Sequence, residues 1–363
     1  MKPPVIGRIA AAIASASVLV LAACGGGSHD DRMQVRSMVV FGDSLSDVGT
    51  YAAATGDPRN PGKFTVNPGS VWVENIAAAY GLKLTPNRSL TLDKDASGVA
   101  TASTGTATVL GGKGYAEGGA RIVDYPMQSG IGNNEIVASV TRQIDNYLAA
   151  NASVPPGELI VLNGGGNDTY AQFAAICWGL DNNGVGAGNT TQAIADEAIA
   201  RAARQQLANA RRLKAAGAQV VLLNLASDWS ANPFAAHYLP AAAQASGCYA
   251  QVPPTQITTW TAQFNKIVQD GLAGTEGIVV LDADKDFAAV LANPGASGFT
   301  NVTDAACNNR TPTDSATFCT TSTLVDPNGS ETYLWSDSFH PTPHGHRLIS
   351  DAALKKLDDA VRK

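Results

Sequence analysis

The sequence predicts an α/β fold with a mainly parallel central sheet that is covered by helices on both faces. Two observations indicate this fold. Short runs of branched apolar residues alternate along the chain with longer amphipathic segments. The short runs are apolar at nearly every position, which is typical of strands buried on both faces of a parallel sheet. In such a sheet, functional residues gather at the carboxyl ends of the strands.

The predicted elements alternate in a regular order, with strands marked by apolar runs and helices by longer amphipathic patterns. In chain order they are a strand at 38–41, a helix at 71–80, a strand at 159–162, a helix at 190–216, a strand at 219–224, a helix at 255–272, a strand at 277–281, and helices at 284–291 and 343–361.

The borders of two of these helices can be placed from local signals. The alanine-rich helix at 190–216 has Asn189 or Thr190 as its expected N-cap and Gly217 as its expected C-terminal stop. The helix at 255–272 begins after Pro253-Pro254, and proline is well tolerated at a helix start.

We expect a single domain over residues 37–363, since 45% of the residues are hydrophobic and no internal repeat is visible. Two stretches do not fit the alternation of strands and helices. Residues 85–112 are rich in Thr, Ser, Ala and Gly, and residues 295–333 are polar. Both are interpreted as insertions that pass over the sheet edge, where either could shape a substrate cleft.

The N-terminal residues predict export and a lipid anchor. Lys2 and Arg8 precede an apolar stretch at 9–21, which is too short to span a bilayer but suits a signal peptide. It ends in Leu-Ala-Ala-Cys24, which resembles the lipobox of bacterial lipoproteins. The resemblance implies a signal peptide at 1–23 and lipidation of Cys24; an ordinary cleavage site is the alternative.

The residue after Cys24 and the segment that follows predict where the domain is held. Gly25, rather than Asp, follows the cysteine, which by the bacterial sorting rule indicates the outer membrane of the cell envelope. Residues 24–36 are polar and glycine-rich and are expected to form a flexible tether. The formal net charge of −6 and the lack of a basic patch argue against nucleic acid as a partner.

Four cysteines remain beyond Cys24, and an even number in an oxidising compartment favours two disulfides. Three connectivities are possible. We expect Cys307–Cys319, which would close a short polar loop, together with Cys177–Cys248. No C-x-x-C pair is present, so the pattern gives little support to a zinc or thiol-redox site.

Ser44 lies just beyond the predicted strand at 38–41, with Gly42 and Asp43 forming the turn. A serine there would present its hydroxyl at the carboxyl edge of the sheet, near N–H groups that can receive an oxyanion. Taken alone, Gly-Asp-Ser is also common turn chemistry. Ser44 therefore needs partners before it can be interpreted as a nucleophile.

Two glycine-rich segments could supply those oxyanion donors. Asn163 to Asp168 directly follows the predicted strand at 159–162, so the Asn167 amide could donate into a site at the same edge. The glycine pair Gly118-Gly119 could add a main-chain N–H. A phosphate-binding loop is the rival interpretation of the first segment, but the P-loop pattern is not found. A glycine-rich turn with Asn167 as a helix cap is the structural alternative.

Asp337 and His340 are three residues apart, so their side chains can meet in one tight turn. A carboxylate against one imidazole nitrogen fixes the tautomer and leaves the other nitrogen as a base. His344 and His346 lie close by and suggest an alternative metal site together with these two residues. The prolines at 341 and 343 interrupt the spacing that a helical metal site needs, so no metal is expected.

Together these segments resemble the GDSL family of lipases and esterases, also called SGNH hydrolases, over about 38–357. The motif FGDSLSDVG at 41–49 is similar to the first block of the family. Gly165 to Asp168 is similar to the G-x-N-D block, and 337–342 to D-x-x-H-P-T. The second block is less similar, because Gly114 stands where the family often has Asn, although residues 116–120 fit.

The resemblance implies a flavodoxin-like α/β/α sandwich that carries a serine hydrolase site. Ser44 would be the nucleophile, His340 the general base and acid, and Asp337 the residue that orients His340. The N–H groups of Ser44 and Gly119 and the side chain of Asn167 would form the oxyanion hole, with Gly118 as the alternative to Gly119. No cofactor is implied.

The expected substrate is an ester or a lipid, and the expected activity is hydrolysis of carboxylic esters through an acyl-enzyme. Phospholipase activity would use the same residues. One alternative keeps the fold and removes acetyl groups from a carbohydrate. Another is a surface lipoprotein that binds a ligand without catalysis, but the presence of all the expected catalytic groups argues against it.

Overall fold

The computed structural model describes residues 34–94, 100–123, 136–178, 191–238, 252–307 and 315–361, besides Met1. From residue 34 onward these belong to one compact unit. The predicted signal peptide, the lipidation site Cys24 and most of the predicted tether lie outside the described residues, and so does Cys248. The expectations about them stay predictions.

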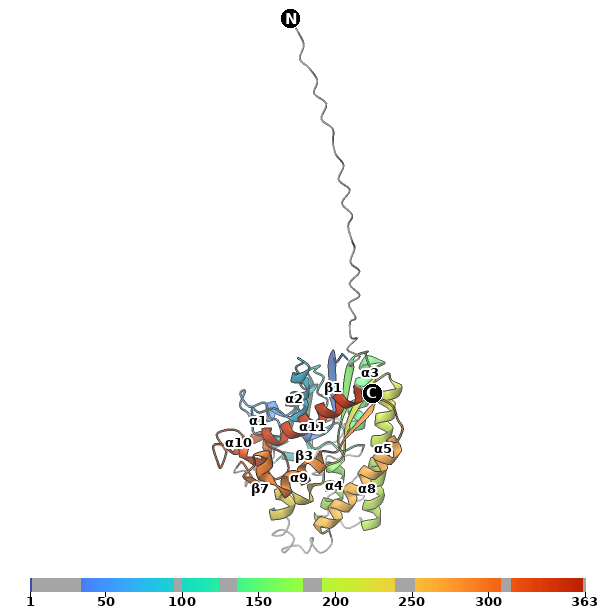
Figure 1. Cartoon of the computed structure of the whole chain (residues 1–363). Helices are drawn as coiled ribbons and strands as arrows, with labels where there is room; N and C mark the ends of the chain where they lie inside the picture. The colour runs from blue at the N-terminus through green and yellow to red at the C-terminus, as the bar shows by residue number, and fades with distance from the viewer. Residues whose placement is uncertain are drawn as a thin grey trace. The chain divides into compact units, whose positions relative to one another are not determined.

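The central sheet of the described residues contains strands in the order β1-β4-β5-β6, and each neighbouring pair is parallel. Figure 1 shows the described ribbon, with β1 of this sheet labelled. In register, Phe41 lies opposite Leu162, and Leu162 lies opposite Leu223. The carboxyl ends of the strands therefore meet at one edge. The strands are β1 (Ser37–Phe41), β4 (Glu158–Leu162), β5 (Val220–Asn224) and β6 (Ile278–Leu281).

A short segment outside the named strands extends the sheet beyond β1. The Val40 N–H donates to the Lys113 carbonyl at 3.1 Å, and the Tyr115 N–H donates to the Val40 carbonyl at 2.8 Å. These bonds hold residues 113–115 beside β1 in the parallel direction. The chain that follows, which contains Gly118 and Gly119, therefore starts at the same edge as the turn after β1.

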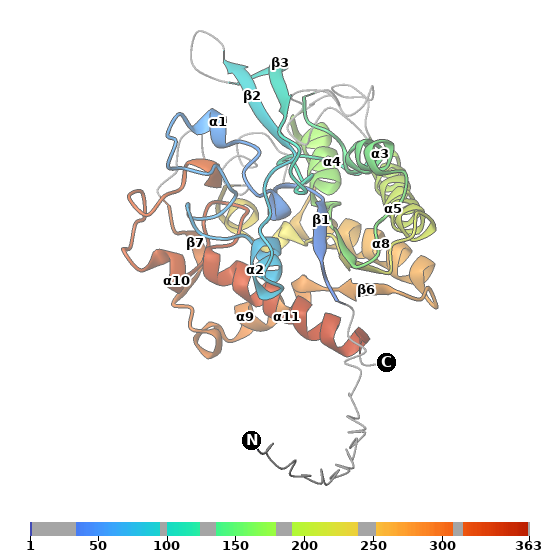
Figure 2. The ribbon, with the colours of Figure 1, turned by 90° about the horizontal axis from the view of Figure 1, so that it is seen from above.

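Helices cover both faces of the sheet, as the apolar runs predict (Figure 2). Val39 and Phe41 of β1 pack into one apolar cluster, and Met38 and Val40 pack into another, because successive side chains of a strand point to opposite faces. The first cluster includes side chains of α3 (Val140–Asn151), α4 (Gly166–Trp178), α5 (Gln192–Ala215) and α8 (Pro254–Leu272), and the second those of α2 (Trp72–Ala79), α9 (Ala283–Ala292) and α11 (Pro343–Val361).

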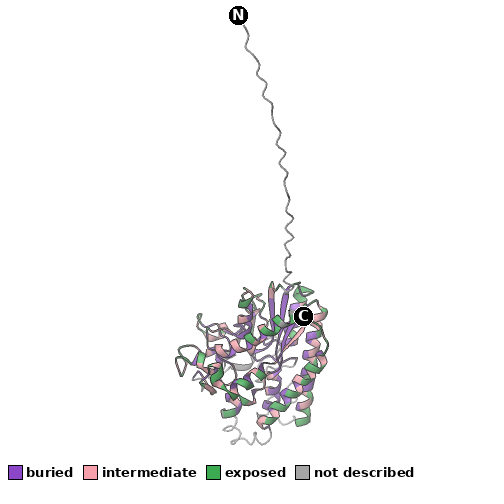
Figure 3. Cartoon of the chain, viewed as in Figure 1, coloured by how far each residue is buried: buried purple, intermediate pink, exposed green. Residues whose placement is uncertain are grey.

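The predicted three-layer α/β/α arrangement is confirmed. Figure 3 shows the strands of the sheet buried between helices whose outer faces are exposed. The predicted helix at 343–361 has the observed bounds, and the other predicted elements agree to within two residues at each end. Helices α3 and α4 are absent from the prediction. Among the described residues, none of the helices combines the length and apolarity that a membrane crossing requires.

The start of α5 corrects the predicted cap. The N-cap is Thr191, whose hydroxyl accepts the Ile194 N–H at 3.3 Å, and not Asn189 or Thr190. These three consecutive residues are all good N-caps, so composition alone does not choose among them. At the other end Gly217 has φ +105° and donates its N–H to the Lys214 carbonyl at 3.0 Å, as expected for a helix stop.

The two predicted insertions contain regular structure. In the first, β2 (Arg88–Lys94) and β3 (Ala100–Val109) form an antiparallel pair, which projects from the layers in Figure 2. In the second, β7 (Asn301–Ala305) pairs with β8 (Tyr333–Trp335), which leads directly to Ser336 and Asp337. The remaining short elements are α1 (Ala52–Thr55), α10 (Gly329–Thr332), the 3-10 helices η1 (Ser44–Ser46), η2 (Trp229–Ala231), η4 (Pro294–Ser297) and η5 (Ala316–Phe318), and the π-helix η3 (Phe234–Tyr238).

Candidate active site

The turn after β1 holds Ser44 at the start of a 3-10 helix. The carboxylate of Asp43 accepts the Leu45 N–H at 3.1 Å and the Asn163 side-chain amide at 2.8 Å. Burial raises the pKa of Asp43 above its usual range. This carboxylate therefore joins the turn after β1 to the turn after β4.

Gly42 is required in this turn because there is no space for a side chain. A Cβ at position 42 would lie 1.7 Å from the Asn163 side-chain oxygen. The main chain of Gly42 is also fixed from α3, since its N–H donates to the Gln143 side chain at 2.9 Å and its carbonyl accepts from the same side chain at 2.8 Å. The sequence carries no local signal for Gln143, which lies 101 residues away.

Ser44, His340 and Asp337 form one continuous hydrogen-bonded chain. The distance from Ser44 Oγ to His340 Nε2 is 2.8 Å, and that from His340 Nδ1 to Asp337 Oδ2 is also 2.8 Å. The His340 side chain is 16% exposed and that of Asp337 is 2% exposed. The structure therefore brings together three predicted site residues that span almost 300 positions.

The Asp337 carboxylate is held on both oxygens. Oδ1 accepts the N–H groups of Phe339 at 2.8 Å and His340 at 2.6 Å, and Oδ2 accepts the Ala316 N–H at 2.7 Å. Burial alone would raise the pKa of Asp337, but the neighbouring imidazole and the N–H groups of His340 and Phe339 outweigh it. The pKa of Asp337 therefore lies below its usual range, and the carboxylate is ionised at neutral pH.

The two candidate glycines differ in the state of their N–H groups. The Gly118 N–H donates to Asp47 Oδ2 at 2.9 Å. Within the described part of the chain, the N–H groups of Gly119 and Ser44 have no hydrogen-bond partner. Gly119 has φ +82°, a conformation that favours glycine. Of the pair, Gly119 therefore has the N–H that can receive an oxyanion.

Asp47 and Phe64 hold this glycine pair in place. The Asp47 carboxylate also accepts the N–H groups of Gly49 at 2.9 Å and Thr50 at 2.7 Å, and burial raises its pKa to about 6. The Phe64 ring packs on the His340 ring with centroids 4.9 Å apart. A Cβ at Gly118 would lie 2.2 Å from the Phe64 ring. Asp47 belongs to the first motif, although no role is predicted for it from the sequence.

Asn167 lies in the first turn of α4, at the carboxyl end of β4. One of its amide hydrogens is donated to the Ala120 carbonyl at 2.9 Å, which places the side chain beside the Gly119 segment. The neighbouring Asp168 accepts the Ile122 N–H at 3.0 Å and lies 3.7 Å from the buried Arg121 guanidinium. These contacts tie the glycine segment to the start of α4.

His344 and His346, the two further histidines of the alternative metal site, each have partners of their own. His346 is fully buried, its Nδ1 accepts the Trp72 N–H at 3.2 Å, and burial lowers its pKa to about 3. His344 stacks on Phe299 with ring centroids 4.3 Å apart. Over the ranges that the structure describes, no group of three His, Cys, Asp or Glu side chains is arranged to hold a metal ion.

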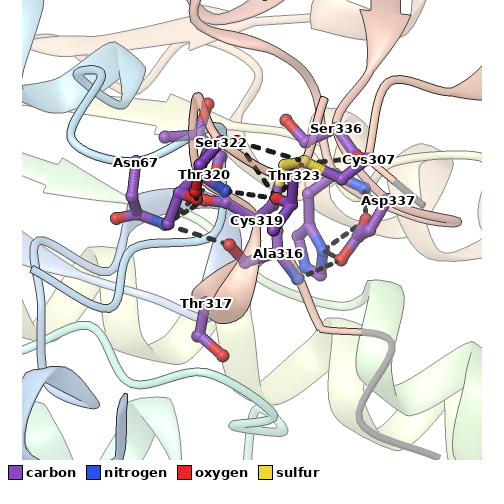
Figure 4. Close-up of a disulfide and its surroundings, with 12 residues drawn as sticks. Asn67, Cys307, Ala316, Thr317, Cys319, Thr320, Ser322, Thr323, Ser336 and Asp337 are labelled. Atoms are coloured by element: carbon purple, nitrogen blue, oxygen red, sulfur yellow. Dashed lines mark hydrogen bonds and ion pairs between the residues drawn. A yellow bond between two sulfur atoms is a disulfide. The ribbon is translucent and has the colours of Figure 1, made fainter. Parts of the chain in front are cut away.

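The predicted disulfide Cys307–Cys319 is confirmed, and it lies close to Asp337 (Figure 4). The predicted partner bond, Cys177–Cys248, cannot be placed in the same way. Cys177 belongs to α4, but its side chain and the whole of Cys248 lie outside the described residues.

The chain matches a known protein family over most of its length. The sequence model of the family described as GDSL-like lipase/acylhydrolase matches residues 38–353. The matched region includes Ser44, Gly119, Asn167, Asp337 and His340. No curated protein matches the chain at a significant level.

Proposed function

Because the chain belongs to the GDSL-like lipase/acylhydrolase family, we propose that this hydrolase cleaves carboxylic esters with Ser44 as its nucleophile. The observation that supports the proposal is the unbroken chain from Ser44 Oγ through His340 to Asp337, with 2.8 Å at each step. A serine hydroxyl is a weak nucleophile by itself, and a base within hydrogen-bond distance activates it.

In the proposed mechanism, Ser44 Oγ attacks the ester carbonyl while its proton moves to His340 Nε2. The imidazolium then gives this proton to the leaving alcohol as the carbon–oxygen bond breaks, which leaves an acyl group on Ser44. A water molecule repeats the sequence and releases the acid. Asp337 remains ionised, and it stabilises the imidazolium through Nδ1.

The negative charge that develops on the carbonyl oxygen needs donors that are already oriented. The N–H groups of Ser44 and Gly119 are suitable, since neither has another partner among the described residues. The Asn167 amide uses one hydrogen for Ala120, and its second hydrogen is the third proposed donor.

We expect Asn167→Ala to lower kcat by a factor on the order of 10²–10³, because one oxyanion donor is lost. Steady-state hydrolysis of nitrophenyl acetate measures the effect. Asn151→Ala is the matched control, since Asn151 also donates to a main-chain carbonyl, that of Tyr147 at 2.8 Å, at the far end of α3. Near-full turnover by Asn167→Ala would refute its role.

Aromatic side chains beside His340 support an apolar ester as substrate. The Phe339 ring stacks on Phe234 with centroids 4.5 Å apart, and Tyr170 lies 5.5 Å from Phe339. Phe339 is adjacent to His340 in the chain, and Tyr170 follows Asn167 by three residues in α4. All three residues are partly exposed, so they can contact an apolar group of the bound ester.

The substrate class is tested with a chain-length series of nitrophenyl esters beside an acetylated sugar. Burial of an extra methylene contributes about 0.8 kcal/mol. We therefore expect kcat/KM to rise roughly tenfold from the acetate to the butyrate. A preference for the acetylated sugar over every nitrophenyl ester would support carbohydrate deacetylation on the same site instead.

A further inference from the structure

The Cys307–Cys319 disulfide lies close to Asp337, the residue proposed to orient His340 (Figure 4). The Cys307 N–H donates to the Ser336 carbonyl at 3.1 Å, and Cys319 Sγ lies 3.7 Å from the same oxygen. Ser336 immediately precedes Asp337. Both cysteines therefore contact the main chain immediately before Asp337.

The disulfide also holds the residue that binds the carboxylate. Ala316 is three residues before Cys319, and its N–H donates to Asp337 Oδ2 at 2.7 Å. The same oxygen faces His340 Nδ1 at 2.8 Å. The Ala316 N–H therefore limits rotation of the carboxylate and keeps Oδ2 directed at the imidazole.

Two strands connect the disulfide to Asp337 on the other side. Cys307 follows β7, and the adjacent Ala306 N–H donates to the Trp335 carbonyl of β8 at 2.8 Å. Trp335 is two residues before Asp337. The S–S bond thus joins the Ala316 segment, residues 315–319, covalently to the strand pair that leads to Asp337.

Side-chain amides from the loop before α2 also bind the Ala316 segment. The Asn67 side-chain amide donates to the carbonyls of Ala316 at 3.0 Å and Cys319 at 3.1 Å, and the Asn60 amide donates to Thr317 at 2.9 Å. These bonds hold the segment against the loop before α2.

On the other side, the Val325 N–H donates to the Ala306 carbonyl at 2.8 Å, and Thr323 Oγ1 lies 3.2 Å from Cys307 Sγ. The chain after Cys319 therefore returns to the β7 chain through hydrogen bonds, and the disulfide is its covalent link to that chain.

We propose that the Cys307–Cys319 disulfide is a positioning element of the catalytic site, which holds the Ala316 N–H on Asp337 so that full turnover requires the oxidised pair. The inference rests on the proposed function. An added dithiol reduces the Cys307–Cys319 disulfide. The S–S bond accepts two electrons and two protons to give two thiols, and the added dithiol is oxidised to its cyclic disulfide.

The test compares the double variant Cys307→Ser/Cys319→Ser with the wild type, both kept oxidised. A hydrogen bond to a charged group is lost or weakened, so we expect kcat for nitrophenyl acetate to fall at least about tenfold. KM should change by less than about twofold, since substrate contacts are unaffected. Near-UV circular dichroism of the same samples reports whether tertiary packing is retained.

Treatment with dithiothreitol adds a second readout and a matched control. The treated wild type and a treated Cys177→Ser/Cys248→Ser variant should lose turnover alike, and reoxidation should restore it. The Cys307→Ser/Cys319→Ser variant should show no further loss. If that variant does not fold, the comparison of treated wild type with treated Cys177→Ser/Cys248→Ser replaces it.

Unchanged kcat after removal or reduction of this disulfide would overturn the proposal. So would a loss of activity that only follows the loss of the circular dichroism signal, because that would assign the disulfide to stability alone. The proposed function is judged separately, since an oxidised wild type that hydrolyses no ester would contradict it whatever the disulfide does.

Discussion

Replacement of Ser44 by alanine is expected to lower kcat for ester hydrolysis by a factor on the order of 10⁶, while the fold is retained. Ser44 Oγ is the group within hydrogen-bond distance of His340 Nε2, and without it no acyl group can be transferred to the protein. Within the described part of the chain, Ser44 Oγ has no other hydrogen-bond partner, so thermal unfolding should change little. Hydrolysis of nitrophenyl acetate and circular dichroism measure the two effects.

Ser46→Ala is the matched control, because Ser46 lies two residues away and is buried. Its hydroxyl accepts the Trp72 indole N–H at 3.0 Å, so its removal leaves a buried donor without a partner at a cost of roughly 1–3 kcal/mol of stability. The two variants should therefore show opposite phenotypes. Turnover by Ser44→Ala within tenfold of the wild type would contradict its role as the nucleophile.

Asp337→Asn is expected to lower kcat by a factor on the order of 10⁴ with little change in size or shape of the side chain. The reason is the number of donors around the carboxylate. Oδ1 accepts two N–H groups, and Oδ2 accepts the Ala316 N–H and faces His340 Nδ1. An asparagine amide must turn its NH₂ either toward the N–H groups of Phe339 and His340 or toward the Ala316 N–H and His340 Nδ1. The second orientation stabilises the wrong tautomer of His340.

The kinetic signature of Asp337→Asn is a loss in kcat, since a residue that acts through His340 does not bind the ester. Steady-state kinetics with nitrophenyl acetate separate kcat from KM. Asp351→Asn on the exposed side of α11 is the control for a charge change of the same kind. If Asp337→Asn retained more than about a tenth of wild-type turnover, the Asp337 carboxylate would not be needed to orient His340.

The sequence was sufficient to predict the layers of the fold and the segments that meet at the candidate site, because both depend on local signals. The strands are continuous apolar runs, and Ser44 and Asn167 follow strands directly. Asp337 and His340 are three residues apart, so a single turn brings them together. The register of the parallel strands then places these segments at one edge.

The supporting contacts could not be predicted, because they join residues that are distant in sequence and carry no motif. Gln143 binds Gly42 from 101 residues away, and Asp47 binds Gly118 from 71 residues away. The Ala316 N–H on Asp337 is a main-chain group, so residue type gives no signal for it. Only the folded arrangement also explains why Gly119, and not Gly118, has its N–H without a partner among the described residues.

Some missed features did have a signal in the sequence. The β3 segment contains Thr106 and Thr108 at alternate positions, and β-branched residues in alternation favour a strand, although the stretch is interpreted as an insertion. Helix α3 begins after Ser139, a good N-cap whose hydroxyl accepts the Arg142 N–H at 3.3 Å. Its apolar positions, Val140, Ile144 and Tyr147, follow the helical period.

The most direct test of the account is reaction with a fluorophosphonate followed by mass spectrometry of the intact protein and of its peptides. We expect one adduct per chain, on Ser44, which is absent from Ser44→Ala and forms far more slowly in His340→Ala. An esterase-active protein that carries its adduct on another residue, or none at all, would contradict the assignment of Ser44 as the nucleophile.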